Sequence, residues 1–208
     1  MSQVAKLMRL IAALSLAVVL AACSELRIPF LSSGSKIEEK VEVIAVMPVE
    51  GSAAPGGESS ELERGAEGVV TAAVYGALSN SYEWRFVPDI TTNDAMRGIS
   101  SLDSPEKRAA ALAKAVKADA VIFGTVWRYV EREGPAEAAD RPASVAFTLR
   151  LLVASSGEVV WEETYDKTQE TLSSNIFEWA LFWEEGPHWL SAAELTNAGV
   201  DAMIDNLR

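Results

Sequence analysis

Few side chains in this sequence could take part in chemistry, and their contexts limit what they could do. Cys23 is the only cysteine and His188 the only histidine among 208 residues. A zinc site needs several nitrogen and sulfur ligands, so these two residues alone cannot build one. His188 follows Gly186-Pro187, a turn sequence, and no Gly-x-Ser-x-Gly motif offers a nucleophilic serine. We interpret His188 as a polar turn residue, and we predict no metal site and no catalytic residues.

Among the adjacent glutamates of the sequence, Glu162-Glu163 and Glu184-Glu185 are the candidates for paired carboxylates. Acid–base catalysis and calcium binding both need the carboxylates to converge on one point. Neighbouring residues on a strand point to opposite faces, and the sequence has no Asp-rich calcium loop. We therefore interpret both pairs as solvated surface residues.

A glycine-rich stretch, Gly51 to Ser59, lies between a predicted strand and a predicted helix, where a phosphate-binding loop would lie. That motif needs Lys and then Ser or Thr after its last glycine. Gly57 and Glu58 stand in those places, and a carboxylate repels phosphate. We predict a surface loop that binds neither a nucleotide nor another cofactor.

The most concentrated aromatic cluster falls in a predicted helix over residues 173–185. Its bulky apolar residues point almost all round the helix: Ile176, Phe177, Trp179, Leu181, Phe182 and Trp183. A helix that is apolar all round is buried within its own domain or covered by something else. One alternative is core packing against the sheet. The other is a partner-facing patch with Trp179, Phe182 and Trp183 as anchors, since tryptophan is enriched at interface hot spots.

The N-terminus has the organisation of an export signal. Lys6 and Arg9 precede the apolar run Leu10–Leu20, which is shorter than the roughly 20 residues of a spanning helix. Leu20-Ala21-Ala22-Cys23 resembles the bacterial lipobox, whose cysteine receives lipid and becomes the first mature residue. The resemblance implies a signal peptide over residues 1–22 and a covalent diacylglycerol and N-acyl lipid on Cys23. The alternative, an ordinary signal peptide, would leave an unpaired exported thiol.

Charge narrows the possible partners. Without Lys6 and Arg9, 16 basic residues face 30 acidic ones, a net charge of −14 for residues 23–208. Nucleic-acid binding depends on Lys and Arg, so we predict no nucleic-acid partner. The same charge disfavours direct adhesion to an anionic bilayer, so the lipid must supply membrane attachment. By analogy with enteric bacteria, Ser24 after the cysteine indicates the outer membrane, with the protein facing the periplasm.

Residues 23–40 are predicted to be a lipidated tether, and residues 41–208 a single α/β domain with a helical tail over 173–207. The 17 residues after Cys23 span at most about 60 Å. Apolar periodicity predicts strands at 41–49, 82–88, 120–130, 144–153 and 159–165, and helices at 60–78, 104–116, 173–185 and 191–207. Crossover helices make the first three strands parallel, and short turns make the rest an antiparallel meander. We expect a mixed five-stranded sheet of order 2-1-3-4-5, covered by helices.

Capping signals give three of the helix starts. Ser60 with Glu63, and Ser191 with Glu194, have capping-box spacing. Ser104 followed by Pro105 is typical of an N-cap and first-turn proline.

Three segments carry a family resemblance: VIAVMPVE (43–50), ADAVIFGTVWRYVERE (118–133) and VAFTLRLLVASSGEVVWEETY (145–165). Together with the lipobox they resemble the periplasmic lipoprotein group around the curli secretion channel CsgG, which includes LpoB and the N-terminal domain of TolB. The resemblance implies a non-enzymatic envelope scaffold that acts through protein partners. The channel's long transmembrane hairpins have no counterpart here, so we predict no pore. The short tether makes reaching across the cell wall awkward.

These patterns favour a lipid-anchored scaffold or accessory subunit at the periplasmic face of the outer membrane, with an unidentified envelope protein as its partner. The alternative is an envelope hydrolase whose site is not recognisable from sequence. A concave pocket with converging polar groups would favour the enzyme.

Overall fold

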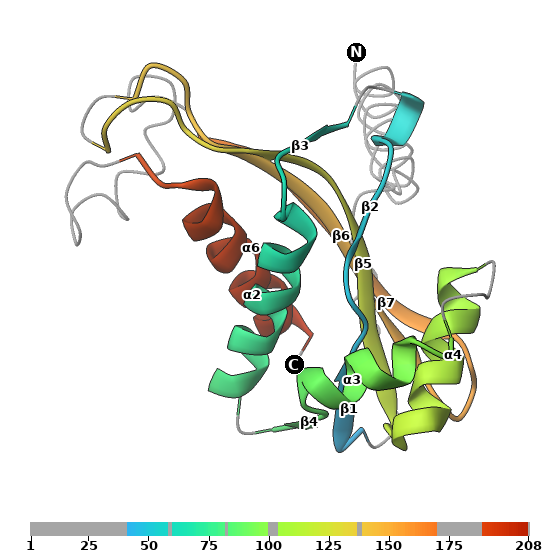
Figure 1. Ribbon diagram of the computed structural model, residues 1–208. Helices are drawn as coiled ribbons and strands as arrows, with labels where there is room; N and C mark the ends of the chain where they lie inside the picture. The colour runs from blue at the N-terminus through green and yellow to red at the C-terminus, as the bar shows by residue number, and fades with distance from the viewer. Residues whose placement is uncertain are drawn as a thin grey trace, which may run out of the picture. The chain divides into compact units, whose positions relative to one another are not determined.

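The computed structural model describes residues 41–57, 60–81, 83–99, 104–136, 139–169 and 189–207. They build one mixed sheet with helices against it (Figure 1). Its main path runs β4-β1-β5-β6-β7, formed by Arg85–Phe86, Val43–Val46, Ala120–Val130, Ser144–Val153 and Val159–Thr168. The first three strands are parallel and the last three antiparallel. The predicted strand order 2-1-3-4-5 is confirmed.

β5 and β6 lie at the centre because their side chains are apolar on both faces. Along β5, Ile122 belongs to the core on one face of the sheet, and Val121 and Phe123 to the core on the other. Gly124 lets the two strands approach closely: a Cβ there would lie 2.2 Å from the Thr148 carbonyl oxygen. A strand buried on both sides accounts for the nearly continuous apolar run.

Two short strands extend the sheet beyond the predicted five. β2 (Glu50–Gly51) and β3 (Glu61–Leu62) pair in parallel with β5, farther along it than β1. Between them the predicted surface loop contains a short 3-10 helix, η2 (Pro55–Gly57).

The predicted helix start at Ser60 and Glu63 is wrong. Helix α2 (Ala66–Asn80) begins after Gly65, whose φ is 89°, and has no side-chain cap. The Glu63 N–H instead donates to the Tyr129 carbonyl at 3.1 Å, and its carboxylate accepts from the Glu131 N–H at 2.7 Å. Pairing with the long strand β5 satisfies these groups, so the capping box does not form.

The helices form two sets. α2 and α6 (Ala192–Asn206) pack on one core, while α3 (Asp89–Met96) and α4 (Pro105–Val116) pack on the other (Figure 1). The capping box of Ser191 and Glu194 is confirmed, as is the Ser104 N-cap. α3 was not predicted, because Thr92 is its only buried residue and no apolar stripe marks it.

Several predictions concern parts of the chain outside the described residues. The signal peptide, Cys23, the tether, His188 and the aromatic helix over 173–185 all belong there. Among the described helices, none is long and apolar enough to cross a membrane.

Candidate functional site

The two ends of the sheet hold the connections to the segments from which function was predicted. At one end, here called the tether end, β1 begins directly after the predicted tether. Asp119 holds this start: its Oδ2 accepts from the Glu42 N–H at 3.0 Å and from the Val43 N–H at 2.9 Å. The Arg85 N–H donates to the Glu42 carbonyl at 2.9 Å. The point at which the tether enters the domain is therefore defined by hydrogen bonds.

At the opposite end, the residues on either side of 170–188 are held together. The Leu190 N–H donates to Gln169 Oε1 at 2.8 Å, and Gln169 is 7% exposed. The Gln169 N–H donates to the Ala143 carbonyl at 3.1 Å, and the Trp189 N–H to the Ala136 carbonyl at 2.6 Å. The chain thus leaves β7 and returns to α6 at the end of the sheet where β5 and β6 are connected (Figure 1).

Two charged residues that follow β5 complete this end. Arg132 Nη1 donates to the Trp189 carbonyl at 2.8 Å, and its buried Nε has no hydrogen-bond partner within the described part of the chain. The Glu131 carboxylate accepts from the Ala192 N–H, with both oxygens at 3.2 Å, at the N-terminus of α6. An acidic group is favourable there because the helix dipole is positive at that end.

β5 sets the separation of the two ends. Ala120, its first residue, pairs with Ile44 of β1, and Val130, its last, is followed by Glu131 and Arg132. Its 11 residues span about 36 Å. The predicted partner-facing residues Trp179, Phe182 and Trp183 lie outside the described residues. Gln169 and Trp189, which flank their segment, lie at the opposite end of β5 from the start of β1.

The structure separates the carboxylates of the described glutamate pair. Glu162 Oε2 accepts from Arg150 Nε at 2.6 Å, whereas Glu163 Oε1 accepts from Asn206 Nδ2 of α6 at 3.1 Å. They point to opposite faces, as predicted, and do not converge on one atom. Within the described ranges no three His, Cys, Asp or Glu residues are placed to hold a metal ion.

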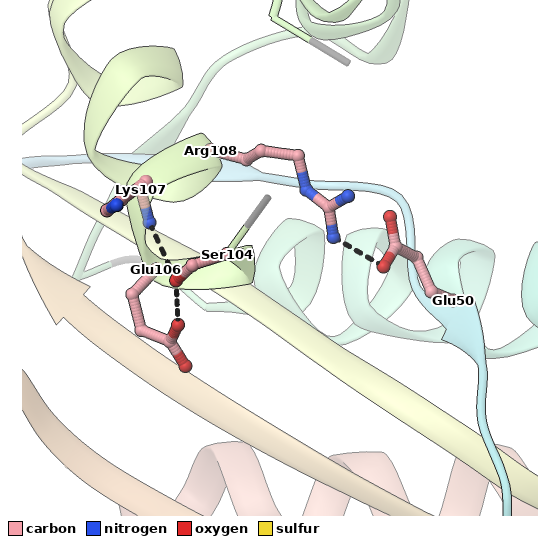
Figure 2. Close-up of polar contacts among 5 residues, drawn as sticks. All are labelled: Glu50, Ser104, Glu106, Lys107 and Arg108. Atoms are coloured by element: carbon pink, nitrogen blue, oxygen red, sulfur yellow. Dashed lines mark hydrogen bonds and ion pairs between the residues drawn. The ribbon is translucent and has the colours of Figure 1, made fainter. Parts of the chain in front are cut away.

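Two acidic residues lie at the start of the glycine-rich stretch, Glu67 against Gly51 and Glu50 directly before it. A Cβ on Gly51 would lie 2.9 Å from Oε1 of Glu67, in the first turn of α2. Figure 2 shows the other contact, in which Arg108 Nη2 of α4 donates to Glu50 Oε2 at 2.6 Å. The Arg108 side chain is 15% exposed, and this ion pair joins β2 to α4. A carboxylate at the α2 N-terminus occupies the position that favours a phosphate.

Figure 2 also shows how α4 begins. The Lys107 N–H donates to Ser104 Oγ at 3.5 Å, and Ser104 Oγ in turn donates to the Glu106 carboxylate. The Ser104 hydroxyl is the main reason that the pKa of Glu106 lies below its ordinary value. This cluster is satisfied internally and accounts for the helix start.

Two tyrosines, the buried Tyr129 and the half-buried Tyr75, have raised pKa values. Burial raises the pKa of Tyr129, with smaller Coulombic contributions from Glu131 and Glu63. Burial also raises the pKa of Tyr75, and a hydrogen bond with Thr92 partly offsets this. Both phenols are therefore neutral at ordinary pH.

Comparison with known proteins gives structural neighbours only. No protein-family model matches the sequence, and no curated protein does. Similar solved structures include the PelC dodecamer from Paraburkholderia phytofirmans (14% identity, 82% of this chain and 91% of that one, TM-score 0.49). They also include the LpoB C-terminal domain from Salmonella enterica (18%, 64% and 87%, 0.44) and lipoprotein GNA1162 from Neisseria meningitidis (15%, 68% and 90%, 0.45).

The resemblance to LpoB is confirmed. At these identities it concerns the fold and carries no function. The sequence did not predict the roles of Asp119, Gln169 and Arg132, because each side chain hydrogen-bonds to a backbone group that is distant in the chain. Gln169 is the one that could have been noticed, as a polar residue that ends an alternating strand.

Proposed function

We propose that this chain is a lipid-anchored, non-enzymatic lipoprotein of the bacterial envelope. It acts as a scaffold or accessory subunit, through protein–protein contacts on the periplasmic side of the outer membrane. Leu20-Ala21-Ala22-Cys23 after an apolar run carries this proposal, because the only thiol of the chain stands at the position that a lipobox acylates. Ser24 supports the outer membrane by analogy.

The start of β1 and the two flanks of the aromatic segment lie at opposite ends of the sheet, which supports anchoring at one end and partner binding at the other. The tether enters beside Asp119, and the aromatic segment is flanked by Gln169 and Trp189 about 36 Å away along β5. A domain anchored at one end presents the other to a partner. Trp179, Phe182 and Trp183 are the residues that we propose to contact it.

The rival is an envelope hydrolase. Among the described residues the glutamate pair diverges, and in Figure 2 Arg108 pairs with Glu50 while Glu106 accepts from Ser104. Neither cluster offers the converging groups that a hydrolase needs. Binding therefore has more support than catalysis.

The anchor is tested by mass spectrometry of the mature wild-type protein and of Cys23→Ser. The wild-type N-terminal peptide should begin at Cys23 and carry acyl mass. The serine variant should lose that mass and either leave the membrane fraction or remain as precursor. A mature wild-type N-terminus elsewhere, or an unmodified Cys23, contradicts the proposal.

The partner-facing segment is tested by recovery of co-purifying envelope proteins from detergent extracts. Trp179→Ala, Phe182→Ala and Trp183→Ala are compared with Lys114→Ala, a control that truncates an exposed side chain of α4. At least one of the three should weaken recovery of a partner while the unfolding temperature stays close to wild type. If all three instead cost the 3–5 kcal/mol typical of truncating a large core residue, the segment is core.

A further inference from the structure

All three large apolar side chains that the described residues expose lie at the tether end. They are Phe86 (37% exposed), Ile90 (68%) and Val159 (37%). Phe86 pairs with Ile44, which pairs with Ala120, the first residue of β5. Val159 pairs with Leu152, which pairs with Val121, the second residue of β5. Phe86 and Val159 thus occupy adjacent rows at opposite edges of the sheet, and because adjacent rows face opposite sides they lie on opposite faces of it.

Ile90 belongs to the same end because α3 follows β4 after two residues. The Val87 N–H donates to the Ile44 carbonyl at 2.9 Å, and Ile90 is the second residue of α3. β4, the start of α3 and the start of β1 lie together in Figure 1. We call Phe86, Ile90 and Val159 the apolar set. Single exposed apolar side chains need no explanation, and these three form no contiguous patch, since Phe86 also packs against Tyr75 with ring centroids 6.0 Å apart. What needs an explanation is that every large apolar side chain exposed by the described residues lies at this end of the sheet.

The tether indicates what covers them. It enters the domain two residues before β1, and Glu42 is hydrogen-bonded to Arg85, the neighbour of Phe86. A lipid on Cys23 is separated from the domain by 17 residues, which reach at most about 60 Å. A short flexible linker gives an effective concentration in the millimolar range, so a contact too weak to bind membrane alone becomes populated.

We propose that the tether end rests on the bilayer that holds the lipid, with the apolar set in contact with the interfacial region of the membrane. This inference depends on the proposed lipidation of Cys23. Side chains of this kind bury about 5–10 Å into the boundary between headgroups and acyl chains. The opposite end, with Gln169 and Trp189, then points away from the membrane.

Charge sets the lipid composition. Asp89 and Glu158 are exposed beside the apolar set, and the one basic neighbour of Phe86, Arg85, is paired with Glu42 at 3.7 Å. The chain without its signal peptide has a net charge of −14. Anionic headgroups repel these carboxylates. The contact is therefore with zwitterionic lipid, and anionic lipid weakens it.

The test places a fluorescent probe on the full, lipidated protein in vesicles. Ile90→Cys is labelled with an environment-sensitive dye, and Asp140→Cys, an exposed position near the opposite end, is the matched control. Acylated Cys23 does not react, so each variant carries one probe. In phosphatidylethanolamine–phosphatidylcholine vesicles, emission at position 90 should shift to the blue and be quenched several-fold more by nitroxide lipids than at position 140. Phosphatidylglycerol should reduce that difference.

Each outcome decides the inference. Equal quenching at both positions on vesicle-bound protein overturns the inference and leaves lipidation intact. A blue shift at position 90 without quenching means that the tether or a second copy covers the apolar set, and also overturns it. Protein that stays free of vesicles with a reactive Cys23 overturns both this inference and the proposed function. A circular dichroism spectrum equal to wild type shows that the variants are folded.

Discussion

Gly199→Ala in α6 is the substitution for which the structure gives the clearest expectation. An ideal Cβ at this position would lie 2.7 Å from Cδ1 and 2.8 Å from Cε1 of Tyr165 in β7. Tyr165 cannot simply retreat, because its ring packs on Phe147 with ring centroids 5.4 Å apart, and Phe147 is fully buried. Either α6 or the tyrosine ring must move.

Two opposing terms determine the size of the effect. Alanine is about 0.8–1.0 kcal/mol more favourable than glycine in a helix interior. Overpacking a filled contact costs about 1–3 kcal/mol. We expect a net destabilisation of up to about 2 kcal/mol, because the contact with Tyr165 outweighs the helix propensity.

Gly76→Ala in α2 is the matched control. Gly76 is exposed, and a Cβ there would meet no heavy atom within 4 Å. This variant should gain up to about 1 kcal/mol from propensity alone. Urea unfolding of detergent-solubilised full-length protein measures both, and the thermal midpoint should move by about 2–4 °C per kcal/mol in a chain of this size. The reasoning fails if Gly199→Ala stabilises the protein as much as Gly76→Ala does.

Three further predictions concern the two ends of the sheet. Gln169→Ala should cost about 1–3 kcal/mol in urea unfolding, because the Leu190 N–H loses its acceptor at a buried site. Hydrogen exchange at Leu190 should become faster in the same variant, and unchanged exchange there would contradict this. Asp119→Ala should increase hydrogen exchange at Val43 and Asp119→Asn should restore protection, whereas unchanged exchange in Asp119→Ala would exclude the bond. Burial raises the pKa of Tyr129, so its contribution to stability is present below pH 10 and is lost as the pH rises through its folded-state pKa. Tyr129→Phe should therefore reduce the fall of the unfolding free energy with pH above pH 10. An unchanged slope would contradict this.

The long strands were predictable because their patterns are long. β5 and β6 run for 11 and 10 residues, so apolar runs and alternation identify them without knowledge of their neighbours. β2 and β3 have two residues each, too few for any period, and exist only because β5 offers an unpaired edge beyond β1.

The two sequences with capping-box spacing show when a local pattern fails to predict a helix start. Ser191 and Glu194 form the capping box, and the helix begins there. Ser60 and Glu63 have the same spacing, but the backbone of Glu63 pairs with Tyr129 and the helix starts later. An N-cap contributes about 1 kcal/mol, so pairing with a neighbouring strand can override it.

Residues of the candidate site also differ in whether a local sequence pattern identifies them. The prediction at Cys23 comes from a lipobox pattern that is local in sequence, and Cys23 lies outside the described residues. Asp119 and Gln169 were not predicted, because their backbone partners lie up to 77 and 21 residues away. Residues that hold a chain in place leave no periodic signal when one side chain meets one distant N–H group.

β5 connects the two ends of the sheet. It pairs with β1 at its first residues, where Asp119 precedes it, and continues into Arg132, which bonds to Trp189. A bend or slip in this strand would therefore change the tether end and the aromatic attachment together. Two features of the contact with β6 oppose such a slip: β6 pairs with nearly the whole length of β5, and Gly124 fits closely against Thr148 of β6. A rigid central strand is what a scaffold needs if anchoring at one end is to determine where the other end lies.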